Sequence, residues 1–119
     1  MALTAAQAAA DKLADDIRIL DIGDLLAITD YFVLVSARND LMLKTVVENV
    51  EREIKERYGR GPKRREGTPA TGWMILDYGD VVLHGFTTEQ RDFYDLERLW
   101  SDAPVLPFVD AAIAEASGE

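Results

Sequence analysis

Residues 31–36 read YFVLVS, a continuous apolar run rich in β-branched and aromatic side chains. A strand that is apolar on both of its faces needs cover on both faces, so this run indicates a central strand of a sheet. The chain has 119 residues, which is enough for one such core and too few for separate cofactor and substrate domains. We therefore expect a single folded domain built around this strand.

Two helices are expected on either side of this strand in the sequence. Residues 4–15 are strong helix formers, and the partly alternating stretch 17–23 follows them as a strand. The second helix starts near Asn39, a residue type that caps helices well, and its apolar residues recur at spacings of three and four as far as Tyr58. Gly59 is suited to the position just past a helix end.

Residues 72–86 predict a β-hairpin. Two apolar runs flank Tyr78 and Gly79, and a turn at these two residues places Asp77 opposite Asp80 and pairs the two strands in that register. One face of the hairpin is then uniformly apolar and is expected to lie against the helices: Met74, Leu76, Tyr78, Val81 and Leu83. The other face is expected to point toward solvent or a partner: Trp73, Ile75, Asp77, Asp80, Val82 and His84.

The segments around the hairpin give weaker signals. Residues 63–66 predict a short strand, and 67–72 a mobile loop. Thr87 and Gln90 match the pattern of a helix capping box. One helix is expected after them, ending before residue 104, with this apolar stripe: Phe93, Leu96, Leu99 and Trp100.

Together these elements predict the α/β class, as a single-domain sandwich of a mixed β-sheet with helices mainly on one face. Residues 1–104 form the expected domain, and 105–119 a C-terminal tail with some helical character. The chain has no cysteine and one histidine, so a disulfide scaffold, a thiolate zinc site and a multi-histidine metal cage are excluded. No run approaches the roughly 20 apolar residues of a membrane span and no export signal is evident, so a cytoplasmic location is expected, without a membrane partner.

Charge is unevenly distributed along the chain. The net charge is −9, and residues 66–119 hold 11 acidic but only 2 basic side chains. Such a segment either keeps a solvated acidic face or forms a docking surface for a basic protein. Residues 57–65 are basic instead, which either fits a polar loop after a helix end or offers a contact to nucleic acid, although no recognised binding motif surrounds them.

Chemistry-bearing residues cluster in the hairpin and the last helix. Asp77 and Asp80 could form a metal-binding or acid/base pair, but aspartates beside a glycine turn often serve local hydrogen bonds. His84 lacks a partner nucleophile and is favoured as a structural residue. The glycine spacing matches no phosphate-binding loop. The last helix mixes acidic and aromatic side chains, as contact surfaces do: Tyr94, Asp95, Glu97, Arg98 and Trp100.

Three segments carry a resemblance to a known family: GWMILDYGDVVLHGF at 72–86, FYDLERLWSDAP at 93–104 and DIRILDIGDLLAITDYFVLVSA at 16–37. They resemble the ribosomal silencing factor family, also called Iojap-like proteins, over residues 11–104. Two positions depart from the family pattern: Gly85 stands where a bulkier aliphatic is expected, and residues 36–38 lack the usual Thr-Gly.

The resemblance implies a fold that is nucleotidyltransferase-like in outline but lacks catalytic residues, hence a protein that is not an enzyme and uses no cofactor. It implies a translation repressor that binds the large ribosomal subunit through its basic ribosomal protein fourteen and sterically blocks joining of the small subunit. A role in ribosome biogenesis or hibernation and a homodimer are implied as well. No sequence-specific nucleic-acid contact is expected.

Residues and resemblance together give a partner-binding site with no catalytic and no metal-binding residue. Aromatic side chains would supply contact area there, while carboxylates would meet lysine or arginine on the partner. The expected members are Trp73, Asp77, Tyr78, Asp80, His84, Tyr94, Glu97 and Trp100. Two alternatives stay open: a nucleotidyltransferase-like enzyme with a metal and carboxylate site, and an RNA-binding module that uses residues 57–65.

Overall fold

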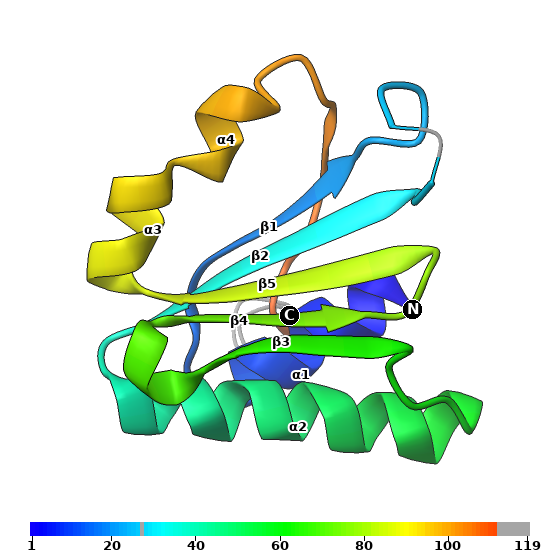
Figure 1. Cartoon of the computed structure of the whole chain (residues 1–119). Coiled ribbons are helices and arrows are strands. Elements are labelled where there is room, and N and C mark those ends of the chain that lie inside the picture. The colour runs from blue at the N-terminus through cyan, green and yellow to red at the C-terminus, as the bar shows by residue number, and fades with distance from the viewer. Residues whose placement is uncertain (27, 112–119) are drawn as a thin grey trace, which may run out of the picture.

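The computed structural model describes residues 1–26 and 28–111 of the chain, and it folds around one mixed sheet of six strands (Figure 1). The strand order is β3-β4-β5-β2-β1-β6. The strands are β1 (Asp15–Asp21), β2 (Tyr31–Ala37), β3 (Arg64–Thr68), β4 (Trp73–Asp77), β5 (Val81–Thr87) and β6 (Val105–Leu106). The helices are α1 (Ala2–Asp11), α2 (Asp40–Tyr58), η1 (Pro69–Thr71), α3 (Thr88–Tyr94) and α4 (Leu96–Leu99).

The apolar run at 31–36 is the central strand that the sequence predicts. Strand β2 runs parallel to β5 on one side and antiparallel to β1 on the other. Phe32 through Ala37 are all buried, because helices lie over both faces of the sheet.

The two longer helices, α1 and α2, cover the same face of the sheet (Figure 1). The start of α2 is fixed by Asn39, whose side-chain oxygen accepts a hydrogen bond from the Met42 N–H at 2.9 Å. Its end is fixed by Gly59, which adopts the left-handed φ of 67°. These helices and the strands beneath them enclose the main core, which we call the helix-side core: its larger members are Ile19, Val33, Val35, Leu43, Val46, Val50, Ile54, Leu76, Tyr78 and Leu83.

The opposite face of the sheet carries a smaller core under the short helices α3 and α4 (Figure 1). We call it the second core: Leu20, Ile22, Phe32, Leu34, Phe86 and Ala103, with Leu26, Trp73, Val82, Leu96 and Trp100 packed against it. The two longer helices thus lie on one face, as predicted, and the short α3 and α4 cover the other. None of the helices in the described residues is long and apolar enough to cross a membrane.

The predicted hairpin register is wrong by two residues. Asp77 pairs with Val82 and Trp73 with Phe86, and Tyr78 closes the turn by donating to the Val81 carbonyl at 2.9 Å, so Gly79 and Asp80 are the turn residues. The faces are nevertheless as predicted, since side chains alternate with a period of two and a two-residue slip returns each one to its original face.

Several predictions about the segments beside the hairpin are also wrong. Residues 67–72 are not a loop throughout, because β3 extends to Thr68 and η1 follows it. Thr87 does precede a helix, but its side chain makes no capping hydrogen bond. That helix stops at Tyr94, since Asp95 turns left-handed with φ 48°, and the chain restarts as α4. Beyond it, β6 pairs with β1 in a contact that the sequence did not indicate.

Candidate functional site

Six aromatic side chains gather on the side of the sheet that α3 and α4 cover, and we call them the aromatic cluster: Phe32, Trp73, His84, Phe86, Tyr94 and Trp100. The Trp73 ring stacks on Phe86 at 5.1 Å between centroids and meets Tyr94 at 4.3 Å. The Trp100 ring meets the edge of Phe32 at 5.6 Å. Residues from β2, β4, β5, α3 and the end of α4 thereby form one continuous set of contacting rings.

Exposure increases from the inside of the cluster to its outside. Phe86 and His84 are buried, Trp73 and Trp100 are half-buried, and Tyr94 is 47% exposed. The prediction that His84 points toward solvent is therefore wrong, because α3 and α4 fold over this face. The parts of the cluster that a partner could touch are the outer surfaces of Trp73, Tyr94 and Trp100.

His84 supports Trp73 from within. The indole Nε1–H of Trp73 donates a hydrogen bond to Nδ1 of His84 at 3.2 Å. Because indole nitrogen only donates, Nδ1 must be the unprotonated acceptor, and the proton of the neutral ring lies on Nε2. Burial lowers the pKa of His84 to about 4, against a smaller opposing effect of the Asp77 carboxylate. The imidazole is therefore neutral near pH 7 and holds the indole in one orientation.

The two hairpin carboxylates already have partners within the chain. Oδ1 of Asp77 accepts the Gly79 N–H at 2.8 Å, which is the local role that aspartates often have beside a turn. Asp80 forms an ion pair with Arg60 at 3.0 Å, and the hydrogen bond from that guanidinium lowers the pKa of Asp80. Within residues 1–26 and 28–111, no three His, Cys, Asp or Glu side chains are grouped in a way that could hold a metal ion.

Tyr78 lies on the other face of the sheet, away from the aromatic cluster. Its side chain is 1% exposed and belongs to the helix-side core, and burial raises the pKa of its hydroxyl. The structure thus brings together Trp73, His84, Tyr94 and Trp100, with Asp77 beside them, while it separates Tyr78 from this group.

Glu97 is also engaged internally, by a residue that the sequence analysis missed. Both of its carboxylate oxygens accept hydrogen bonds from Arg91, at 3.0 and 3.1 Å, and Arg91 is 5% exposed. The sequence contained only a weak signal for this role, namely that Arg91 is one of just two basic residues after position 65.

The basic segment 57–65 is largely charge-compensated. Arg65 forms an ion pair with Glu51, and Arg64 lies 3.7 Å from Glu66. With the Arg60 pair already described, three of its guanidinium groups face carboxylates, which reduces the positive charge that the segment presents to phosphate groups.

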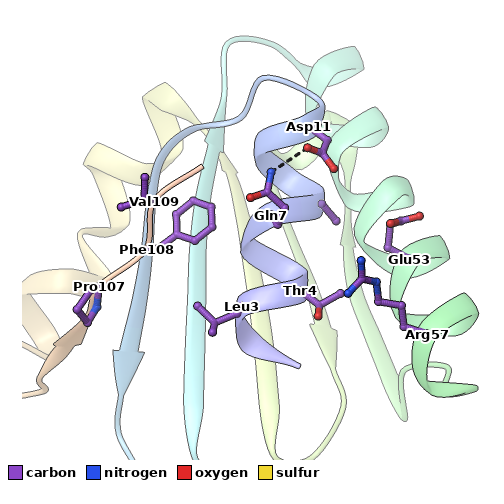
Figure 2. A pocket seen from close by; sticks show the side chains of 10 residues that line it. Leu3, Thr4, Gln7, Asp11, Glu53, Arg57, Pro107, Phe108 and Val109 are labelled. Carbon is purple, nitrogen blue, oxygen red and sulfur yellow. Dashed lines mark hydrogen bonds between the residues drawn. The ribbon is translucent and has the colours of Figure 1, made fainter. Parts of the chain in front are cut away.

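A cavity of about 350 Å³ lies on the helix side, between α1, α2 and the segment 107–109 (Figure 2). The Phe108 ring and the α1 side chains of Leu3 and Gln7 border it, and Glu53 and Arg57 of α2 form its other wall. No predicted site residue lines it. We therefore centre the candidate site on the aromatic cluster, whose outer rings offer contact area to another macromolecule.

Comparison with known proteins agrees with this architecture. The family model "Ribosomal silencing factor during starvation" matches residues 1–118. The ribosomal silencing factor RsfS of Bacillus subtilis is 36% identical over 101 residues, covering 85% of each chain. The chloroplastic protein Iojap of Zea mays is 36% identical over 110 residues, which cover 90% of this chain and 47% of that protein. A crystal structure from Chromobacterium violaceum superposes with a TM-score of 0.78 at 28% identity, covering 92% of this chain and 89% of the other. On these grounds the chain belongs to the ribosomal silencing factor family, which includes RsfS and Iojap.

Proposed function

We propose that this protein represses translation by binding the large ribosomal subunit through its ribosomal protein fourteen and sterically blocking the small subunit. It is not an enzyme in this proposal, since it acts by occupying a surface. Membership of the ribosomal silencing factor family supports the ribosomal role. The identity of the partner protein, a cytoplasmic location, a homodimer and a part in ribosome biogenesis or hibernation remain predictions.

The observation that carries the proposal is the half-buried Trp73 packed against the exposed Tyr94. Tryptophan and tyrosine contribute much of the binding energy in protein interfaces when they sit in a rigid, partly desolvated setting. Trp73 has such a setting, because Phe86 stacks on its ring and His84 accepts its indole proton. Little side-chain freedom is then lost when a partner covers it.

The charge of the chain suits a basic partner. Residues 66–119, which include the hairpin, α3 and α4, hold 11 acidic side chains against 2 basic ones. An acidic surface speeds and orients encounter with a basic protein, while the aromatic contacts determine how long the complex lasts.

The test is a subunit-association assay. Purified large and small subunits are mixed with and without the protein, and particle formation is followed by sedimentation. We expect the native protein to keep the subunits apart. Tyr94→Ala should bind the large subunit roughly 30-fold more weakly, because truncation at an interface hot spot costs about 2 kcal/mol.

A matched control is available on the helix side. Tyr58, at the end of α2, is 45% exposed, nearly as much as Tyr94, but it lies outside the aromatic cluster. Tyr58→Ala should bind like the native protein. If native protein at saturating dose leaves the subunits free to pair, the proposed function is wrong; if both tyrosine variants bind normally, the site is misplaced.

A further inference from the structure

The guanidinium of Arg91 makes four hydrogen bonds and one longer ion pair inside the protein. Nε and one terminal nitrogen donate to the two oxygens of Glu97, at 3.0 and 3.1 Å. The other terminal nitrogen donates to Oγ of Ser36 at 2.8 Å and to the backbone carbonyl of Asp16. The Asp16 carboxylate lies 3.5 Å from the nitrogen that also meets Glu97. One side chain from α3 therefore joins α4, β1 and β2.

The backbone is kinked at two residues around this guanidinium. Strand β1 has a bulge between Asp15 and Arg18, and Asp16 within it has a left-handed φ of 48°. Asp95, which separates α3 from α4, also has a φ of 48°. Left-handed backbone is unfavourable for residues other than glycine and persists where surrounding contacts hold it. At Asp16 the stabilising contact is the hydrogen bond that Arg91 donates to the Asp16 carbonyl. Across the kink at Asp95 it is the bidentate ion pair between Arg91 and Glu97.

Two members of the aromatic cluster lie at the ends of the two helices that this network joins. Tyr94 is the last residue of α3, immediately before the kink, and Trp100 is the C-cap of α4, immediately after it. Their positions relative to Trp73, on β4, therefore depend on how α3 and α4 are held against the sheet. The only other cation that pairs with Glu97 among the described residues is Arg18 of β1, at 3.3 Å, which again ties α4 to the sheet.

We propose that Arg91 and Glu97 are positioning residues: their bidentate pair, anchored on the bulge at Asp16 and on Ser36, fixes the bend between α3 and α4 and so sets the spacing of the partner-binding aromatic side chains. This inference rests on the proposed function for the docking step. It differs from the expectation that Glu97 meets a basic side chain of the partner, because both carboxylate oxygens already accept hydrogen bonds from Arg91.

A lysine in place of Arg91 separates geometry from charge. Lys keeps the positive charge but is a point donor that cannot form the planar two-point contact with a carboxylate. Three variants are compared with the native protein: Arg91→Lys, Glu97→Gln and the double variant. The first readout is binding to the large subunit. The second is hydrogen exchange of the amides of residues 88–100 in the free protein, which needs no ribosome.

We expect each single variant to bind on the order of tenfold more weakly, and the double variant to bind no worse than the weaker single one, because both changes break the same pair. Exchange of residues 88–100 should rise in all three, while α2 stays protected. The matched controls make the same changes elsewhere: Glu89→Gln on an exposed site of α3 and Arg52→Lys on an exposed site of α2. Both controls should bind and exchange like the native protein.

Two outcomes would overturn the inference. If Glu97→Gln loses binding while Arg91→Lys binds normally, Glu97 contacts the partner directly. If exchange of residues 88–100 does not change in any variant, the pair does not hold this segment. If the proposed function is wrong, the native protein itself does not bind the large subunit, and the docking part of the inference is lost. The exchange data still decide whether the pair of Arg91 and Glu97 fixes the bend between α3 and α4.

Discussion

His84 gives a direct test of how tightly the aromatic cluster is packed. It is the only histidine of the chain, so its ring signals in a proton NMR spectrum need no assignment among others. It is 8% exposed, and burial lowers its pKa to about 4 from the ordinary 6.5. The perturbation is a fall in pH, and the matched variant is His84→Asn, whose side-chain oxygen can still accept the indole proton of Trp73.

The size of the effect follows from linkage. Above pH 6.5 the ring is neutral in both states, so the full stability is present. As the pH falls from 6.5 toward 4, the unfolded chain binds a proton that the folded protein does not, and the free energy of unfolding decreases. One pKa unit corresponds to about 1.4 kcal/mol, so His84 alone should lower the stability by about 2 kcal/mol at pH 5 and about 3 kcal/mol at pH 4.

The assay is urea unfolding, followed by circular dichroism at pH 7 and pH 5. Native protein should lose about 2 kcal/mol more than His84→Asn over this interval, since carboxylate titration is common to both. The NMR titration gives an independent value for the folded state. A His84 ring that titrates above pH 6, or an equal loss in both proteins, would refute the packing argument, because it would mean that water reaches the imidazole.

Three further predictions concern stability alone. Leu13 is 75% exposed with φ 66°, so Leu13→Gly should stabilise the fold by about 1 kcal/mol and raise the melting temperature by a few degrees in calorimetry; a lower melting temperature would contradict this. A Cβ on Gly85 would lie 3.0 Å from Leu43 and 3.1 Å from Val47, so Gly85→Val should cost about 1–3 kcal/mol in urea unfolding; an unchanged stability would contradict the tight contact with α2. Leu34 is fully buried in the second core, and Leu34→Ala should cost about 2–5 kcal/mol by the same assay; a loss below about 1 kcal/mol would mean that this core is loosely packed.

The elements that the sequence predicted best are those with purely local signals. Strand β2 is apolar at nearly every position, and α2 has both an Asn39 cap and a Gly59 stop. Neither prediction therefore required knowledge of contacts with distant parts of the chain. The hairpin shows the limit of such reasoning. Gly79 could be the second central residue of a turn at 78–79 or the first central residue of a turn at 79–80, because hairpin turns accept glycine at either position. In the structure it is the first, with φ 92°. The pattern of side chains is the same for both registers.

The candidate site could be predicted only in its aromatic residues. Trp73, Tyr94 and Trp100 stand out by residue type. Their exposure, however, depends on the break between α3 and α4 at Asp95, and no residue near Asp95 indicates a helix break. The role of Arg91 could not be derived from the weak signal in the sequence, because that role requires a backbone carbonyl at Asp16, 75 positions away. A contact of that kind follows from the completed fold and from no local pattern.

The three carboxylates predicted for the site shape how such a surface can recognise a partner. Asp77 is bound to its own turn, Asp80 to Arg60 and Glu97 to Arg91, so all three are partly committed inside the chain before any partner arrives. An ion pair with a partner would have to compete with these contacts, and exposed pairs contribute only about 0–1 kcal/mol each. In the proposed complex, the acidic side chains would therefore direct the approach of a basic protein, while the lifetime of the complex would come from the apolar area of Trp73 and Tyr94. It follows that in the proposed complex the geometry of Trp73 and Tyr94, and not the number of acidic residues around them, would set the affinity.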